Sequence, residues 1–281
     1  MPRLTVFLPQ SFASDVPGLR EATSKVGFVG RVLATFRADA LLLYPDSREK
    51  THLRNAGFIR EVLEYLTTAP YLRKQLYPLK PSLRYAGLLP PLNIPTHPEA
   101  EAVKTGGTHY RQALVLSSGE TSLLDAGLGK PLKIRSRLPK NSVVVLKVKV
   151  AGKHVKYRVV SKRSVEVYNG FKTRIVNSLD EALKQFDYRI ATSRLGEPVD
   201  QALDKLSQNL KSAKDVCVVF GSADRGLHKI VEDLGLDYNS LFDITVNTVP
   251  EQGVKTIRTE EALAYTLAVL NLVVRMQRAG T

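Results

Sequence analysis

The sequence has 281 residues, 43% of them hydrophobic, enough for one large domain or two modest ones with packed cores. Lys and Arg number 41 against 27 Asp and Glu, and the formal charge of +14 favours a polyanionic partner. The single cysteine excludes an intramolecular disulfide and a CxxC metal site. The chain shows no signal-peptide pattern and no apolar segment of the ~20 residues that span a bilayer. We therefore expect a cytoplasmic protein without membrane or metal partners.

The first part of the chain alternates between apolar strands and a helix. LTVFLP predicts a buried strand, and ADALLLYPD predicts a second one. The helix between them is expected to begin at a cap formed by Ser14 or Asp15, just before Pro17. Strands that are apolar throughout and separated by a helix are typical of a parallel sheet covered on both faces. Mostly helical sequence follows, and the prolines clustered between Pro90 and Pro98 mark a connector.

The middle of the chain changes character. YRQALVL, PLKIRS, SVVVLKVKV and HVKYRVVSKR are short β-patterned runs separated by turn residues, which predicts a small all-β module, sandwich or barrel. The last two runs predict a hairpin around Ala151 and Gly152. A barrel of the OB type fits the strand count, but the pattern does not distinguish it from other barrels. We place the module at residues 94–165, between two parts of an α/β domain at 1–93 and 166–281.

Nearly all of the excess positive charge lies in and beside this module. Residues 130–174 hold fourteen Lys and Arg against one acid, Glu166, a formal charge of +13. Segregated charge favours RNA binding over a merely solvated basic surface. Strand alternation turns Tyr157 toward the core, whereas Tyr168 and Phe171 are candidates for base stacking. The candidate RNA-binding residues are Lys133, Arg135, Arg137, Lys147, Lys149, Lys156, Arg158, Lys162 and Arg163.

The α/β pattern returns after residue 171, with three strands that each run into turn-forming sequence. TSRLGEP follows YRIA, GSADRG follows VCVVF, and NTVPEQG follows FDITV. In open parallel sheets, ligands bind beyond the carboxyl ends of the strands. The glycines of these turns would let backbone come close to a ligand, at Gly196, Gly221, Gly226 and Gly253. The dinucleotide-binding and Walker A glycine patterns are missing, which counts against an ordinary doubly wound nucleotide enzyme. Together the three turns predict a pocket for a small cofactor.

Other chemically reactive side chains are expected to be structural. Thr259 is a good N-cap for a final helix over residues 260–278, and Glu260 and Glu261 follow in its first turn, where the helix dipole favours acids. Cys217 lies in the apolar run DVCVVFG, which predicts an inert, buried thiol. The five histidines are scattered without metal-ligand spacing, and none qualifies as a general base.

The two C-terminal loop regions resemble motifs of a known superfamily. VNTVPEQGVKTIRTEEALAYTLAVLNL resembles the last motif of the SPOUT superfamily of RNA methyltransferases, and VVFGSADRGL resembles the motif before it. NAGFIREVLEYLTTAPYLRKQLYPL and AGLLPPLNIPTHP are similar to the archaeal and eukaryotic branch with an OB-like insertion, whose members are described as RNA uridine N3 methyltransferases. The resemblance covers nearly the whole chain. It departs at Arg194, where the branch usually has an acid, and near His97, where the branch has a second histidine.

This resemblance implies a fold, a cofactor and a substrate. The fold would be a parallel-sheet α/β domain with a trefoil knot, interrupted by a small OB-like β-barrel; the knot rests on the resemblance alone, since knotted chains are rare. A homodimer would use S-adenosylmethionine to methylate rRNA or tRNA, with uridine N3 as the suggested atom. Arg194 is the candidate catalytic residue, because a cation would stabilise a developing base anion, and its position at a strand end equally suits contact with a phosphate. The residues implied at the cofactor are Thr192, Ser193, Gly221, Gly226, Asn247, Pro250, Gly253, Thr256 and Ile257.

A rival hypothesis remains at this stage. In a non-catalytic RNA-binding or ribosome-associated protein, the three turns would merely close the sheet, and the basic module would still bind RNA. That protein would have no affinity for the cofactor. Cofactor binding therefore separates the two hypotheses.

Overall fold

The computed structural model describes residues 2–47, 52–104, 106–152, 154–161 and 164–279. The chain divides into two compact units. The first comprises Met1–Glu64, Tyr85–Leu89 and Phe171–Thr281, and the second comprises Tyr65–Arg84 and Pro90–Gly170. We expected boundaries after residues 93 and 165. The observed division differs from this mainly in Tyr65–Arg84, which belongs to the same unit as the β-module. Helix α2 (Leu53–Thr67) runs from the first unit into the second.

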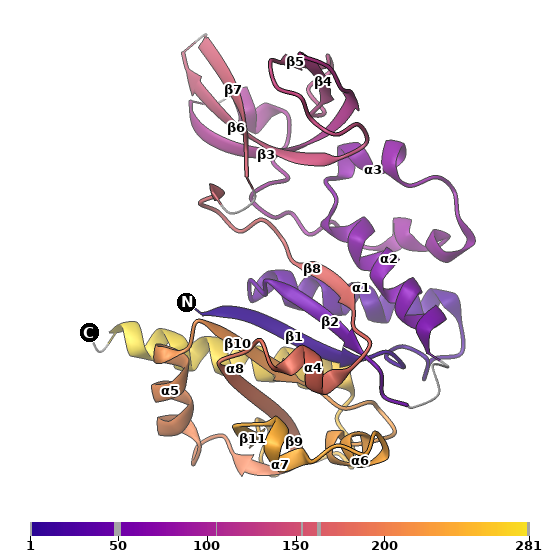
Figure 1. The fold of residues 1–281 in the computed structure, drawn as a ribbon, viewed down its shortest axis with the longest axis vertical. Helices are drawn as coiled ribbons and strands as arrows, with labels where there is room; N and C mark the ends of the chain where they lie inside the picture. Colours follow the sequence, from indigo (N-terminus) through magenta and orange to yellow (C-terminus); the bar gives the residue numbers. More distant parts are fainter. Residues whose placement is uncertain (1, 48–51, 105, 153, 162–163, 280–281) are drawn as a thin grey trace. The chain divides into compact units, whose positions relative to one another are not determined.

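The first unit is built on a six-stranded parallel sheet (Figure 1). The strand order is β11-β9-β10-β1-β2-β8, and every neighbouring pair is parallel. The strands are β1 (Arg3–Pro9), β2 (Ala40–Tyr44), β8 (Lys172–Ile175), β9 (Tyr188–Pro198), β10 (Asp215–Val219) and β11 (Ile244–Asn247). Because β10 pairs with β1, opposing Thr5 with Cys217, sequence from both ends of the chain forms one sheet. The predicted parallel sheet is confirmed.

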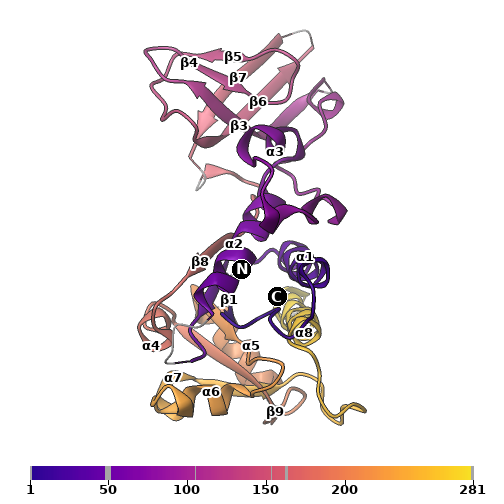
Figure 2. The same ribbon diagram turned by 90° about the vertical axis from the view of Figure 1, so that its right-hand side faces the viewer.

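Helices cover both faces of this sheet (Figure 2). α1 and α8 lie on one side in mutual contact, and α4, α6 and α7 lie on the other. The trefoil knot implied by the resemblance stays a prediction. The helices that begin in this unit are α1 (Leu19–Thr35), α2, η2 (Ala86–Leu88), α4 (Leu179–Leu183), α5 (Leu203–Ser212), α6 (Leu227–Asp233), α7 (Tyr238–Leu241) and α8 (Thr259–Ala279).

The start of α1 differs from the sequence expectation. The helix follows Gly18, and no side chain caps its first turn. Asp15 instead accepts two hydrogen bonds from the ammonium of Lys25, at 2.7 and 2.6 Å. The predicted cap at Ser14 or Asp15 is therefore wrong, because the carboxylate is engaged by a buried lysine. That lysine also pairs with Glu260 at 3.2 Å, which ties α1 to the start of α8.

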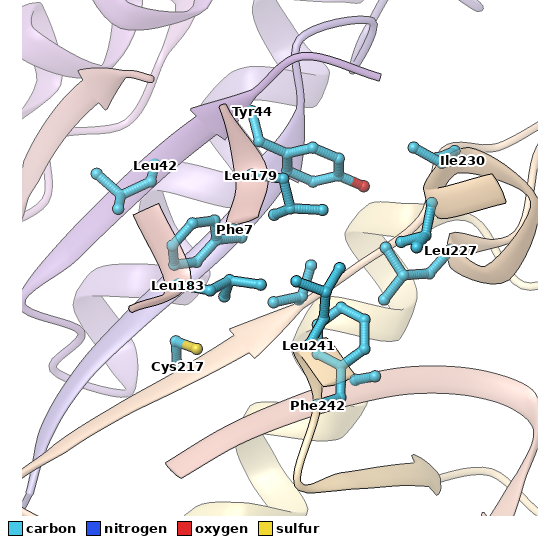
Figure 3. Packing of buried hydrophobic residues seen from close by; sticks show 13 residues of the cluster. Phe7, Leu42, Tyr44, Leu179, Leu183, Cys217, Leu227, Ile230, Leu241 and Phe242 are labelled. Carbon is cyan, nitrogen blue, oxygen red and sulfur yellow. The ribbon is translucent and has the colours of Figure 1, made fainter. Parts of the chain in front are cut away.

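The core between the sheet and α4, α6 and α7 contains the single cysteine (Figure 3). Cys217 is fully buried beside residues such as Phe7 and Leu183, and burial raises the pKa of its thiol. A maleimide needs an accessible thiolate. We therefore expect no modification of the native protein at about pH 8 and complete modification in denaturant, measured by mass spectrometry. Equal modification rates in the two conditions would contradict this placement.

The second unit is a five-stranded antiparallel, barrel-like sheet in the order β5-β4-β3-β6-β7. The predicted all-β module is confirmed, as is its hairpin, in which Ala151 of β6 opposes His154 of β7. The sequence did not predict β4, because its four residues lie among turn formers. The strands are β3 (Gly107–Ser117), β4 (Ser122–Asp125), β5 (Leu132–Ile134), β6 (Val143–Ala151) and β7 (His154–Val160). The unit's short helices are α3 (Pro70–Leu76), η1 (Pro81–Leu83) and η3 (Glu101–Lys104).

A buried polar network holds the Pro-rich connector against β3. The guanidinium of Arg111 is almost fully buried, donates to the carbonyls of Pro98 and Ala126, and lies 4.1 Å from the ring centre of Tyr71. His97 is also buried, and its Nε2 lies 3.1 Å from the carbonyl oxygen of Thr67. These contacts replace water around polar groups that burial would otherwise penalise.

The same network makes stability depend on pH. Burial, and next the charge of Arg73, lower the pKa of His97 from 6.5 to about 4. Between those values the unfolded chain binds more protons than the folded one, so stability falls as pH falls through this window. The contribution of His97 is at most about 3 kcal/mol. Denaturant titrations should show a smaller loss from pH 7 to 4.5 in His97→Gln than in the wild type; identical pH profiles would contradict the assignment.

Candidate cofactor site and basic surface

Three loops meet at one edge of the parallel sheet: those that follow β10 and β11, and residues 192–196 within β9. They enclose a cavity of about 390 Å3, within the usual range for small-molecule sites. This is the end of a parallel sheet at which ligands ordinarily bind. The lining comes from residues 192–195, 220–227, 246–249 and 252, from 255–257, and from Thr259, Ala262 and Thr266 of α8.

The β9 loop is an interruption within a strand, not the end of one. Ala191 opposes Thr245 of β11, and the next pair joins Glu197 to Val246, so residues 192–196 bulge out of the ladder. The expectation that this strand ends at TSRLGEP is therefore wrong, because pairing resumes beyond the bulge. A Cβ on Gly196 would lie 2.7 Å from the carbonyl carbon of Val246. Gly196 thus permits the close approach of β11. It does not line the cavity, so its expected position beside a ligand is wrong.

The β10 loop is a tight turn that leads into α6. A Cβ on Gly221 would lie 2.8 Å from the amide nitrogen of Leu227 and 2.9 Å from the carbonyl oxygen of Arg225. The amide of Ser222 donates to that same carbonyl at 3.0 Å, closing the turn. At Gly226, by contrast, a Cβ would meet no atom within 4 Å. Gly221 is required by the turn, whereas Gly226 leaves space beside the cavity that it lines.

An ion pair between Arg225 and a buried carboxylate holds this turn in place. The side chain of Asp46 is fully buried, and Oδ2 lies 3.0 Å from Nη2 of Arg225. Nη1 of Arg225 donates to the main-chain carbonyl of Asp46 at 3.0 Å, and the amide of Ser11 donates to Oδ1 at 3.2 Å. Loops after β1, β2 and β10 are thereby joined. Sequence reasoning missed this pair, because its members are 179 residues apart and Asp46 belongs to no motif.

The third loop, residues 248–258, is held by the other two. The side-chain amide of Asn247 donates to the carbonyl of Arg194 at 3.0 Å and accepts from the amide of Val249 at 3.0 Å. Nη1 of Arg194 in turn donates to the carbonyl of Lys255 at 3.0 Å. The hydroxyl of Thr259 donates to the carbonyl of Gly221 at 3.1 Å. The three loops therefore form one hydrogen-bonded assembly.

The start of α8 corrects one expectation and confirms another. The hydroxyl of Thr259 bonds Gly221 across the site, so Thr259 does not act as a side-chain N-cap. The amide of Arg258 donates instead to the carboxylate of Glu261 at 2.9 Å, as in a capping box. Glu260 pairs with Lys25. The structural role predicted for Glu260 and Glu261 is confirmed.

Most of the predicted cofactor residues lie around one cavity, together with Arg194. Those lining it are Thr192, Ser193, Gly221, Gly226, Asn247, Thr256 and Ile257. Gly253 lines an adjoining cavity of about 600 Å3 with Val254 and Tyr265. Pro250 lines neither of these two cavities. The functional role of each residue stays a prediction.

The predicted RNA-binding residues lie mainly on exposed parts of the β-unit. Lys147 opposes Arg158 and Lys149 opposes Lys156 across the β6–β7 hairpin. The other exposed members, on and after β5, are Lys133, Arg135 and Arg137, while Lys162 and Arg163 lie outside the described residues. Tyr157 packs against the interior cluster, as predicted. Phe171 is buried, so it does not offer a ring for base stacking and that expectation is wrong.

The described residues contain neither a metal centre nor a membrane-spanning helix. No group of three or more histidine, cysteine, aspartate or glutamate side chains in that part of the chain is arranged to hold a metal ion. Of the helices whose residues are described, none has the length and apolar character needed to cross a membrane.

Comparison with known proteins gives matches over nearly the full chain. The model of a family described as "Putative RNA methyltransferase" matches residues 3–270. An uncharacterized protein of Haloarcula marismortui is 33% identical over 95% of this chain and 98% of its own length. A Mus musculus protein named 28S rRNA (uridine-N(3))-methyltransferase is 28% identical over 95% of this chain and 75% of its own. The structure of TrmJ from Z. mobilis has 12% identity and a TM-score of 0.38 over 97% of this chain and 70% of its own, a likeness from which nothing further follows.

Proposed function

Because the chain belongs to the RNA methyltransferase family whose model matches residues 3–270, we propose that it transfers a methyl group from S-adenosylmethionine to a base in structured RNA. The observation that carries the proposal is the cavity lined by three interlocking loops, which follow β10 and β11 and interrupt β9. Uridine N3 is the proposed acceptor atom, supported by the name of the mouse relative. An rRNA substrate and the predicted cytoplasmic location belong to the same proposal.

The cavity suits a cofactor held largely by backbone groups. Its lining is rich in loop residues with small side chains, and Gly226 leaves open space beside it. Ile257 supplies apolar cover, while main-chain groups near Thr256 and Gly221 would read the adenine edge. Bound S-adenosylmethionine supplies a methyl group that is already activated on a sulfonium. The protein's task is therefore to hold donor and acceptor in line, and positioning of this kind can provide much of the rate.

The charged groups at the cavity fit an acceptor that must lose a proton. Arg194, Arg225 and Lys255 line it, whereas Asp224 is the one acid among the lining residues that the structure describes. The carboxylate of Asp224 accepts from Ser222 at 2.6 Å, which lowers the pKa of Asp224, so it is a weak base. We assign Arg194 to stabilising the negative charge that develops on the base. The proton then leaves to water without a dedicated protein base.

The proposal includes a homodimer formed through α8. Tyr265, Leu272 and Met276 of this helix are exposed and follow one another at helical spacing. Exposed Val254 continues the stripe at the adjoining cavity. A second copy is the occupant we commit to, since contiguous apolar surface of this kind marks an association site. Light scattering should give twice the mass of one chain, and Leu272→Lys should give the mass of one.

The catalytic proposal is tested by methyl transfer. Purified protein, labelled S-adenosylmethionine and unmodified rRNA are incubated, and the RNA is digested to nucleosides. The expected product is 3-methyluridine, formed much more slowly by Arg194→Gln. If RNA and the cofactor both bind and no labelled nucleoside forms with any rRNA fraction, the proposal of methyl transfer is overturned. If the cofactor does not bind either, the non-catalytic RNA-binding hypothesis replaces it.

A further inference from the structure

The outer surface of the β3–β6–β7 sheet carries a regular array of cations. On β6, Lys147 and Lys149 are two residues apart and face away from the interior cluster that contains Leu146 and Val148. Their partners on β7 are Arg158 and Lys156. We call these four residues the cationic face. Strand geometry spaces them by about 6.8 Å along a strand and about 4.8 Å between strands.

This arrangement is unfavourable for an isolated sheet. Like charges directly opposite each other on neighbouring strands destabilise the pairing. The ammonium of Lys147 is 3.0 Å from the carboxylate of Glu166. The other three cations are exposed and form no ion pair with the residues that the structure describes. A polyanion that bridges both strands would remove this repulsion. A surface that is only solvated gains nothing from placing like charges opposite each other.

On the described strands β3, β6 and β7, the cationic face offers no open tyrosine or phenylalanine ring for base stacking, and the exposed ring that shares the face is the small imidazole of His154, two residues before Lys156. On the neighbouring β3, Tyr110 opposes Lys147 and is 4% exposed, with the Lys147 ammonium 5.4 Å from its ring centre. Tyr157 of β7 packs into the interior. Proteins that bind single-stranded nucleic acid stack its bases on exposed aromatic side chains. Double-helical RNA is instead recognised through phosphates and 2′-hydroxyls, for which cations and small polar groups suffice.

We propose that the cationic face binds the sugar-phosphate backbone of double-helical RNA, independently of sequence. The inference rests on the proposed function, because it takes RNA as the substrate. It adds that the cationic face contacts a helical segment of that RNA. Thr108, opposite Lys149 on β3, adds a hydroxyl beside the array. Glu166 restrains the affinity, because it occupies Lys147 and places a negative charge beside the phosphates.

The test compares matched charge-removal variants by fluorescence anisotropy. The probes are an RNA duplex of about 20 base pairs and an unstructured oligouridylate of about 40 nucleotides, which carry similar numbers of phosphates. Lys149, Lys156 and Arg158 are replaced by glutamine together. Lys205, Lys211 and Lys214, exposed on or just after α5 in the other unit, are replaced together as a control for net charge. A third variant is Glu166→Gln.

The wild type should bind the duplex more tightly than the single strand. The cationic-face variant should lose roughly tenfold or more in duplex affinity, and the slope of log K against log salt should fall by about one for each phosphate contact removed. Glu166→Gln should bind severalfold more tightly, and the control triple should lose little. Stronger binding of the single strand would overturn the proposal. So would a larger loss when Lys133, Arg135 and Arg137 are removed instead.

These results are separable from the catalytic proposal. S-adenosylmethionine binding, measured by calorimetry, should be the same in all of these variants, because none of the replaced residues lines the cofactor cavity. Thermal melting checks folding, and relief of opposed charges should leave the cationic-face variant at least as stable as the wild type. Loss of duplex binding in the cationic-face variant, with intact cofactor binding, would support the RNA surface and leave the catalytic proposal unaffected. A wild type that does not bind the cofactor would contradict the proposed function and leave the RNA surface unaffected.

Discussion

Arg225→Ala is expected to lower the free energy of unfolding by about 3–5 kcal/mol, because it leaves the carboxylate of Asp46 buried without its partner. That side chain is fully buried and, among the residues that the structure describes, keeps only the hydrogen bond from the amide of Ser11. Arg225 also belongs to the glycine turn beside the cofactor cavity. The variant should therefore bind S-adenosylmethionine more weakly under conditions in which it is still folded. Denaturant titration gives the first quantity and calorimetry gives the second.

A double-mutant cycle isolates the ion pair from side-chain packing. Asp46→Asn removes the buried charge with little change in shape, and in combination with Arg225→Ala it should recover much of the lost stability. The recovery is the diagnostic result, since packing losses at Arg225 would persist in the double variant. If the two single changes are additive, the pair contributes no coupling energy, and the turn is held by other contacts.

Gly226→Leu is expected to weaken cofactor binding strongly while leaving the fold in place. A Cβ at this position meets no atom within 4 Å, and the residue lines the cavity. Its φ of −62° and ψ of 156° are open to any residue, so the main cost to stability is a poorer helix cap, roughly 1 kcal/mol. A leucine would occupy space needed by the ligand and reduce affinity by roughly a hundredfold. The readout is the rise in melting temperature at saturating S-adenosylmethionine.

The matched control is Gly57→Leu. Gly57 lies in α2, away from the cavity, and a Cβ there also meets no atom within 4 Å. Leucine is a better helix former than glycine, so this variant should be slightly more stable and should retain the full ligand-induced shift. A wild-type shift in Gly226→Leu would place the cofactor elsewhere. Loss of the shift in both variants would point to a global effect.

Much of the α/β unit could be predicted because its signals are local. Apolar strands such as β1 and β10 and the long amphipathic helices α1 and α8 are specified by their own residues. β8 escaped prediction because it is a four-residue edge strand with exposed Lys172 and Arg174, and charged edges of this kind do not follow the apolar pattern. Those two cations were attributed to the basic module, yet they belong to the parallel sheet.

The site was predictable as a set of loops but not as a geometry. Turn formers in three strand-linked segments indicated where the cavity lies, although the first of them falls within β9 and not after it. The bulge at residues 192–196, the fit of Gly196 against β11 and the Asp46–Arg225 pair all depend on contacts between distant segments. Periodicity and propensity describe a segment's own preference and carry no information about its distant neighbours. The same limit explains why Thr259, a good local cap, bonds Gly221 instead.

The central claim is that the cavity formed by the three loops holds S-adenosylmethionine. Calorimetric titration of the purified protein with S-adenosylmethionine, and with S-adenosylhomocysteine in parallel, tests it most directly. The predicted result is saturable binding of both, with one ligand per chain and a matching rise in melting temperature. Absence of heat and of thermal stabilisation with either ligand, in the presence of duplex RNA as well as without it, would contradict the claim and leave an RNA-binding protein with no cofactor site.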